Sequence, residues 1–262
     1  MDTAFVLPEL AGWSVICLRP AMQQAAARRA VQARGARHVS LPGLALLPPP
    51  DVALAREHLR KSLDCPVLVF TSPAAVAFAA RLLPLAQTPA EQVFAVGEGT
   101  RRALARQGLM ALAPPDDAMH SEGLMTMPHW DAISGRVGLV TAPGGRGVIA
   151  AGLARRGLQV QRAEVYQRQP PRLDAWHWRA LAQAGAPRAV LVSSGEALDA
   201  VLAAVPAQLR PTLLDSVAVA SSARLALLAG DAGFAHSLTA AAPTVPAMLD
   251  ELAAYAAAPG FR

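Results

Sequence analysis

The sequence repeats itself once, and this repeat restricts the fold more than any other feature. A shift of 122 residues aligns four pairs of segments in the same order along the chain, and slightly larger shifts align three more. Because a chain of 262 residues that contains one unit twice exceeds the usual size of a domain, we expect two similar domains. The first four pairs are 15–18 with 137–140, 33–35 with 155–157, 48–49 with 170–171 and 70–72 with 192–194; the other three are 95–97 with 218–220, Arg101 with Arg224 and 108–109 with 233–234.

Each copy alternates short apolar runs with stretches that favour helix. The runs are SVICL, PVLVF and QVFAV in the first copy and RVGLV, AVLVS and SVAVA in the second. Turn residues bound them, and stretches rich in Ala, Arg and Leu follow. Continuous apolar strands that alternate with helices indicate a parallel sheet covered on both faces. The sequence therefore predicts an α/β protein of two similar flavodoxin-like or Rossmann-like domains with parallel sheets, joined by two linker strands.

Segments marked by proline occupy equivalent places in the two copies, at 38–50 and 159–171. Because proline disfavours helix and paired prolines are typical of linkers, we assign 41–50 and 162–171 as inter-domain linkers. If the chain crosses between the domains at both linkers, residues 1–40 and 172–262 form one domain and 51–161 form the other. A simple tandem of the two copies also fits the repeat, and the spacing alone does not decide between them.

Charge and hydropathy limit the partners of the chain. The net charge of +5 and the pI of about 10.2 favour an anionic partner. Nucleic acid is not expected, because the arginines occur singly or in pairs and only 5% of residues are aromatic. No uninterrupted apolar stretch is long enough to cross a bilayer, and the first ten residues lack the features of a signal peptide. We therefore expect no membrane association, a cytoplasmic location and, by default, a monomer.

Several kinds of site find no support in the sequence. Cys17 and Cys65 lie beside apolar runs and are expected to be buried. The histidines lack the spacing of metal ligands and are expected at the surface or in linkers. The GGRG segment is not a P-loop, and no GxGxxG motif follows a strand. Neither a nucleophilic triad nor a pair of catalytic carboxylates can be assembled, so these motifs indicate no metal or nucleotide cofactor.

Small, hydroxylated and glycine residues follow every predicted strand. Ligands of open parallel sheets bind beyond the carboxyl ends of the strands, where helix N-termini present free N–H groups to anions. We therefore expect an anion-binding rim, although Ser and Thr in such loops also serve as helix N-caps. The candidate binding residues of these loops are Arg19, Thr71, Ser72, Gly97, Thr100, Arg101, Gly145, Arg146, Ser193, Ser194 and Ser222.

Tyr166 is one of only two tyrosines and lies within the second linker, in AEVYQRQPP. A residue that links two domains borders the cleft between them. With an ordinary pKa of about 10, its phenol is protonated at neutral pH and can donate a proton. Tyr166 is therefore the candidate catalytic residue; the alternative is an aromatic side chain that packs against a domain face.

An ordered series of motifs resembles the uroporphyrinogen-III synthase family over nearly the whole chain. The series includes LRP, VLVFTSPAAV, VFAVGEGTRRAL, GLQVQRAEVYQRQPP and VLVSSGEAL. The resemblance implies the exchanged two-domain layout, an active site in the inter-domain cleft and no cofactor. It further implies that the substrate is hydroxymethylbilane, a linear tetrapyrrole rich in carboxylates. The product would be uroporphyrinogen III, formed with inversion of the last pyrrole and loss of water.

The resemblance also implies roles for individual residues. Tyr166 would donate the proton to the departing hydroxyl, and the hydroxyls of the other family positions map to Ser72, Thr100, Ser194 and Ser222. Two departures from the family pattern are Glu98, where proline is common, and VASSAR in the last loop, which makes Ser222 an inexact equivalent.

A different class of function is a non-catalytic module of the same fold that binds tetrapyrroles or other polyanions. Binding of the substrate without turnover would identify such a module. A nucleotide-binding Rossmann protein is a further alternative, but the sequence lacks its phosphate motif.

Overall fold

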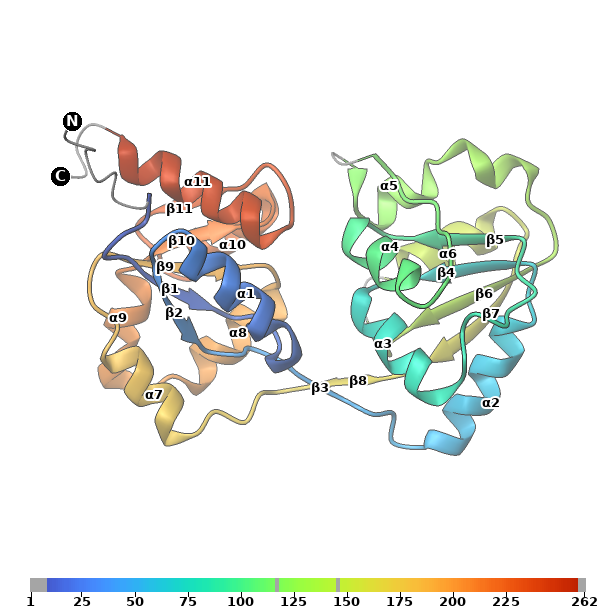
Figure 1. Cartoon of the computed structure of the whole chain (residues 1–262), viewed down its shortest axis with the longest axis horizontal. Coiled ribbons are helices and arrows are strands. Elements are labelled where there is room, and N and C mark those ends of the chain that lie inside the picture. The colour runs from blue at the N-terminus through green and yellow to red at the C-terminus, as the bar shows by residue number, and fades with distance from the viewer. Residues whose placement is uncertain (1–8, 116–117, 145–146, 259–262) are drawn as a thin grey trace, which may run out of the picture. The chain divides into compact units, whose positions relative to one another are not determined.

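The computed structural model describes residues 9–115, 118–144 and 147–258 (Figure 1). The chain divides into two compact units. Unit 1 contains the chain up to Ala45 and again from Gln169 onward, and unit 2 is Leu46–Arg168. Both bounds fall within the segments that the sequence analysis assigns to linkers. No helix in the described part of the chain has the length and apolar character needed to cross a membrane.

Unit 1 is a five-stranded parallel sheet with helices on both faces. The strand order is β11-β10-β9-β1-β2. The strands are β1 (Ser14–Cys17), β2 (Arg37–Ser40), β9 (Arg188–Val192), β10 (Val217–Ala220) and β11 (Ser237–Thr239). One face packs on α1 (Ala21–Ala33) and α11 (Val245–Ala257). The other packs on α7 (Ala175–Ala182), α8 (Gly195–Ala204), α9 (Arg210–Leu214), which follows the 3₁₀ turn η3 (Ala207–Leu209), and α10 (Ala223–Asp231).

Unit 2 repeats this architecture with four parallel strands in the order β5-β4-β6-β7. These are β4 (Val67–Phe70), β5 (Gln92–Ala95), β6 (Arg136–Thr141) and β7 (Gln159–Glu164). One face packs on α2 (Val52–Leu63), α3 (Pro73–Leu82) and α4 (Glu98–Ala105), and the other on α5 (Ser121–Met125), the 3₁₀ turn η2 (Pro128–Ala132) and α6 (Val148–Arg155).

The central strand β4 shows why an unbroken apolar run forms a strand here. Val67 and Val69 point to one face, and Leu68 and Phe70 point to the other, because side chains alternate along a strand. All four are buried, so both faces exclude water. Truncation of Phe70 to Ala would cost about 3–5 kcal/mol of folding free energy.

Strand pairing shows that the two copies of the repeat exchange strands. β1, from the first copy, pairs with β9 from the second, and β4 pairs with β6. A tandem arrangement would instead have paired β1 with β4. The offset of 122 holds through β1 and β6, since Val15 pairs with His38 and Val137 with Val160.

The expected alignment of the last strand of each copy is wrong by two residues. Gln92 pairs with Val67, and Val217 pairs with Ala189, so β5 and β10 are related by a shift of 125, from Gln92 to Val217. Segment 95–97 therefore matches 220–222 rather than 218–220. The apolar runs of β5 and β10 are short and similar, so the sequence pattern alone could not fix their register.

The second linker begins later than the sequence analysis expects. β7 continues to Glu164, and the next two residues, Val165 and Tyr166, belong to the buried core of unit 2. Val165 joins the core cluster, and the Tyr166 ring stacks on Phe78 of α3, which keeps this part of the chain in the unit. Only then does β8 (Gln167–Gln169) pair with β3 (Ala45–Leu47) in a separate two-stranded sheet.

One histidine, His177, is buried, contrary to expectation, and the side chain of His38 is partly buried. His177 is 5% exposed in the first turn of α7, where its Nδ1 accepts a hydrogen bond from the Asp174 N–H at 3.0 Å. His38 is half-buried in β2, and its Nε2 atom is buried without a hydrogen-bond partner in the described residues. Both cysteines are buried and free, as expected.

Candidate functional site

The carboxyl edge of the unit 2 sheet brings Ser72 and Tyr166 together. Ser72 ends the loop after β4 and caps α3, where its Oγ accepts the Ala75 N–H at 3.0 Å. Pro73 follows in the first turn, as its fixed φ favours at a helix start. The same Oγ lies 3.2 Å from the Tyr166 Oη, and either hydroxyl can donate. The local cap therefore fixes a hydroxyl against the phenol.

The Tyr166 ring is held firmly. Only 2% of the residue is exposed, and the ring stacks on Phe78 with a centroid distance of 5.3 Å and an interplanar angle of 15°. The Arg168 guanidinium lies 6.0 Å from the ring centroid, within the range of a cation–π contact. Tyr166 thus packs against its unit, as the alternative explanation proposed, and still presents its hydroxyl to a polar neighbour.

Tyr166 also lines a pocket of about 330 Å³ within unit 2, here called the tyrosine pocket. Its wall is mostly apolar, with Pro143, Leu54 and Ala55, and it carries the titratable side chains of Asp51, His58 and Glu164; the remaining lining residues are Pro49, Pro50 and Gln167. An apolar pocket beside a fixed phenol can hold a flat ligand group within reach of a proton donor.

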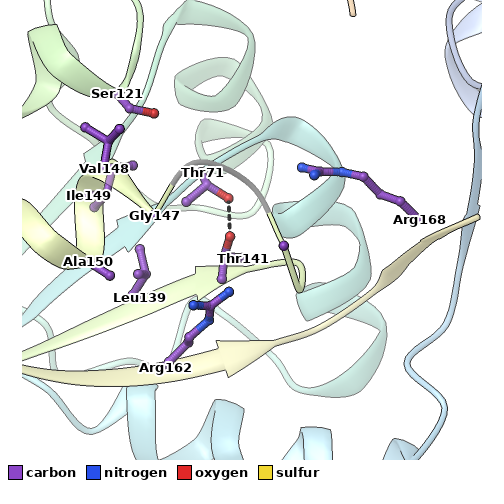
Figure 2. Close-up of a pocket in the computed structure, with 11 residues that line it drawn as sticks. Thr71, Ser121, Leu139, Thr141, Gly147, Val148, Ile149, Ala150, Arg162 and Arg168 are labelled. Atoms are coloured by element: carbon purple, nitrogen blue, oxygen red, sulfur yellow. Dashed lines mark hydrogen bonds between the residues drawn. The ribbon is translucent and has the colours of Figure 1, made fainter. Parts of the chain in front are cut away.

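A second pocket of unit 2 lies at the ends of β4 and β6, and it is here called the arginine pocket (Figure 2). Thr71 Oγ1 donates a hydrogen bond to Thr141 Oγ1 at 3.0 Å, which ties the two loops together. Arg162 and Arg168 approach this threonine pair from β7 and β8, and the first turn of α6 forms the far wall. Its volume is about 160 Å³.

The loop before α4 places its predicted residues elsewhere. Gly97 is the extended N-cap residue of α4, and Thr100 is 3% exposed in the first turn. Arg101 is exposed, and its Nε and Nη2 donate to the two carboxylate oxygens of Glu98 at 2.6 and 2.9 Å. This ion pair holds the pKa of Glu98 below its usual range. Neither pocket of unit 2 is lined by Thr100 or Arg101.

The predicted residues of unit 1 lie at the carboxyl edge of its own sheet. Ser194 caps α8 and Ser222 caps α10, with Oγ accepting an N–H at 3.3 and 3.4 Å. Ser193 is half-buried in the loop before α8. The capping explanation thus applies to Ser194 and Ser222, as to Ser72, but only Ser72 also contacts a tyrosine. Gly145 and Arg146 lie outside the described residues.

Arg19 is a partly buried charged group at the unit 1 edge. Its guanidinium donates to the Gln23 Oε1 at 3.3 Å and to the Pro243 carbonyl at 3.2 Å, and its Nε is buried without a hydrogen-bond partner in the described residues. Burial lowers the pKa of Arg19 from its ordinary value. A desolvated, incompletely paired guanidinium can accept an anion with little further loss of hydration.

Sequence reasoning did not select Thr141, Arg162 and Arg168, which line the arginine pocket. The signal that could have found the two arginines is their spacing: Arg162, Glu164 and Arg168 flank Tyr166 at every second position. In an extended segment, alternate residues share a face. The residues described here contain no cluster of three or more His, Cys, Asp or Glu that could hold a metal ion.

Comparison with known proteins adds independent findings. The family model of uroporphyrinogen-III synthase HemD matches residues 25–250. The uroporphyrinogen-III synthase of Escherichia coli K12 is 33% identical over 143 residues, which span 54% of this chain and 58% of that enzyme.

Two solved structures share the fold over almost their whole length. A mutant uroporphyrinogen III synthase from the extremely thermophilic bacterium Thermus thermophilus aligns with a TM-score of 0.58 at 19% identity, covering 91% of this chain and 96% of that one. The Helicobacter pylori 26695 uroporphyrinogen-III synthetase aligns with a TM-score of 0.61 at 16% identity, covering 92% and 99%.

Proposed function

The chain belongs to the uroporphyrinogen-III synthase family, and we propose that it closes hydroxymethylbilane to uroporphyrinogen III with inversion of the last pyrrole ring. The observation that carries this proposal beyond family membership is the 3.2 Å contact between the Ser72 and Tyr166 hydroxyls at the carboxyl edge of a parallel sheet. Ligand sites of such sheets lie at this edge. The phenol there is fixed and is bordered by an apolar pocket.

The first step of the proposed reaction breaks a carbon–oxygen bond. Tyr166 donates its proton to the hydroxymethyl oxygen of the first pyrrole, water leaves, and a cationic azafulvene remains. The Ser72 hydroxyl can then donate to the phenolate oxygen, since its own oxygen is already held by the Ala75 N–H. A hydrogen bond to an ionised acceptor is roughly twice as strong as a neutral one, so Ser72 favours proton release by Tyr166.

The remaining steps make and break carbon–carbon bonds. The substituted carbon of the last pyrrole attacks the azafulvene and gives a spiro intermediate, which opens and closes again with that ring inverted. The final closure releases a proton from a pyrrole carbon, and the Tyr166 phenolate is a base in position to accept it. Water is eliminated without net oxidation, so these steps require no redox cofactor, and the reaction class is that of a lyase.

Positioning supplies much of the proposed catalysis. Unassisted closure joins the two ends without inversion, so the protein must hold a flexible polyanion in a folded shape before the bond forms. The net charge of +5 favours a polycarboxylate substrate. The monomeric state, the cytoplasmic location and the absence of a nucleic-acid partner stay predictions from the sequence.

The direct test is an assay of the purified protein with freshly generated hydroxymethylbilane. We expect type III product at a rate well above that of spontaneous closure, resolved from type I by chromatography of the oxidised porphyrins. Type I alone, at the uncatalysed rate, would contradict the proposed activity. Tight binding of the substrate without type III product would instead identify a non-catalytic binding module.

A further inference from the structure

The arginine pocket has more hydrogen-bond donors than its protein neighbours use. The Arg168 guanidinium makes no hydrogen bond or ion pair with any other residue in the described part of the chain; its one contact is with the Tyr166 ring. Arg162 uses Nη2 for the Ala142 carbonyl at 3.2 Å and the Glu164 carboxylate at 2.9 Å, which leaves its other two nitrogens for a ligand. Two guanidinium groups with one carboxylate between them leave a net positive charge.

The other walls of the pocket add donors. Thr71 uses its hydroxyl proton for Thr141 at 3.0 Å, whereas the hydrogen bond that Thr141 donates to the Ala142 carbonyl is long, at 3.4 Å, so the Thr141 hydroxyl can turn toward a better acceptor. Val148 and Ile149, in the first turn of α6, have N–H groups without an acceptor inside their helix. None of the described residues that line this cavity is acidic, and the nearby Glu164 carboxylate is already paired with Arg162. A site so rich in donors favours an anion with several oxygen atoms.

Comparison with unit 1 shows that the fold does not require these arginines. The offset of 122 places Ser40 of unit 1 where unit 2 has Arg162, and it places Leu46, in linker strand β3, where β8 has Arg168. Both units form the same parallel sheet with and without the guanidinium groups. The arginines therefore serve something other than folding.

We propose that the arginine pocket binds one side-chain carboxylate of the tetrapyrrole substrate, with Arg168 and Arg162 as the residues that hold it. This inference rests on the proposed function. The Arg168 guanidinium lies over the Tyr166 ring, 6.0 Å from its centroid, so the pocket adjoins the proton donor. The carboxylate is therefore one carried by a terminal pyrrole, the part of the substrate that reacts beside Tyr166. A volume of about 160 Å³ accommodates a short carboxylate side chain.

The test uses steady-state kinetics of three variants with hydroxymethylbilane: Arg168→Gln, Arg162→Gln and Arg168→Lys. Loss of a charge-assisted hydrogen bond to the substrate should raise KM about tenfold in each Gln variant, while kcat stays within about twofold of the parent value. Arg168→Lys keeps the charge but not the planar fork, and it should recover part of the loss. In the parent protein, KM should rise with added salt, and this rise should be smaller in the Gln variants.

Arg155→Gln is the matched control, because it removes the same charge from the exposed last turn of α6, the helix whose first turn lines the pocket. Its KM should equal that of the parent. Circular dichroism and thermal unfolding should be the same for all variants, and the affinity for uroporphyrin III, measured by fluorescence titration, should follow KM.

The two hypotheses fail in different ways. A parent protein that forms no type III product would overturn the proposed function. The carboxylate site would be overturned by a different result: the parent protein forms type III product, but Arg168→Gln and Arg162→Gln have the same KM and the same porphyrin affinity as the control Arg155→Gln.

Discussion

At the carboxyl edge of its sheet, unit 2 carries Tyr166, Thr141 and Arg162. The offset of 122, which the strand register supports, places Leu44, Arg19 and Ser40 of unit 1 at the three equivalent positions, in that order. Leu44 is 7% exposed and joins the core of unit 1, whereas Tyr166 combines burial of its ring with a hydrogen bond from its hydroxyl. The preceding residues differ as well. A Cβ at Gly43 of unit 1 would collide with the Ala197 carbonyl oxygen of α8, whereas the equivalent residue of unit 2 is Val165.

This difference separates what the scaffold needs from what the chemistry needs. Serine at the strand ends persists in both units because each helix there needs an N-cap. The phenol, the threonine pair and the arginines occur in unit 2 alone. We infer that unit 2 supplies the proton donor, whereas unit 1 contributes the desolvated guanidinium of Arg19 at its own sheet edge.

Replacement of Tyr166 by Phe is the strongest test of this division. The ring, its stacking on Phe78 and the core are kept, while the donor is lost. General acid catalysis contributes about 10²–10⁴ to rate, so formation of type III product should fall about a hundredfold or more with little change in thermal unfolding. Tyr255→Phe alters the only other tyrosine, on α11 of unit 1, and should leave the rate unchanged. Equal rates for both variants would remove Tyr166 from the mechanism.

Loss of the cap at Ser72 should have a smaller and mixed effect. Ser72→Ala removes the hydroxyl that caps α3 and also the contact with Tyr166, so we expect about 1 kcal/mol less stability and a rate about tenfold lower. Thr244→Ala removes the cap of α11 in unit 1, where Oγ1 accepts the Ala247 N–H at 3.3 Å. It should cost similar stability without loss of rate. Chemical unfolding reports the contribution of the cap to stability, and initial rates report the contribution of the Tyr166 contact to catalysis. An equal loss of rate in Ser72→Ala and Thr244→Ala would mean that Ser72 acts only through stability.

The architecture could be predicted from sequence because its signals are strong and redundant. Apolar runs such as 67–70 are buried on both faces, and the repeat shows each of them twice. The register of β5 and β10 could not be predicted, since short alternating apolar runs align equally well at neighbouring shifts. The choice between tandem and exchanged copies depends on strand pairs far apart in the sequence, such as β1 with β9, which no local pattern specifies.

The candidate site was predictable only in part. The strand-end rule identified Ser72 and Thr71 because their positions follow from local structure. The position of Arg168 depends on the break between β7 and β8 at Val165 and Tyr166, where both side chains enter the core and the alternation of β7 is interrupted. The role of Arg101 stays a prediction: its guanidinium is exposed after a strand and is paired with the neighbouring Glu98.

Acid should distinguish the two units through stability rather than turnover. Burial, together with the nearby positive charge of Arg28, lowers the pKa of His38 in β2 to about 4, and the equivalent residue in unit 2 is Val160. Between pH 6.5 and 4 the unfolded chain binds a proton at His38 that the folded chain does not, so the free energy of unfolding falls as pH falls through this window. Because the ring is only half-buried, we expect a loss of about 1–2 kcal/mol rather than the full value of the shift.

His38→Val introduces the unit 2 residue at this position and removes the proton site together with the unpaired Nε2. Thermal unfolding measured from pH 7 to 4 should then lose part of its pH dependence, with the largest gain in stability over the parent at the acid end. His129→Gln, in unit 2, alters a histidine outside this strand and should leave the pH dependence of the parent intact. Parallel His38→Val and parent curves across the window would show that the His38 imidazole does not cause the acidic loss of stability. That loss would then come from other groups, such as the carboxylates or His177, whose pKa is also lowered by burial.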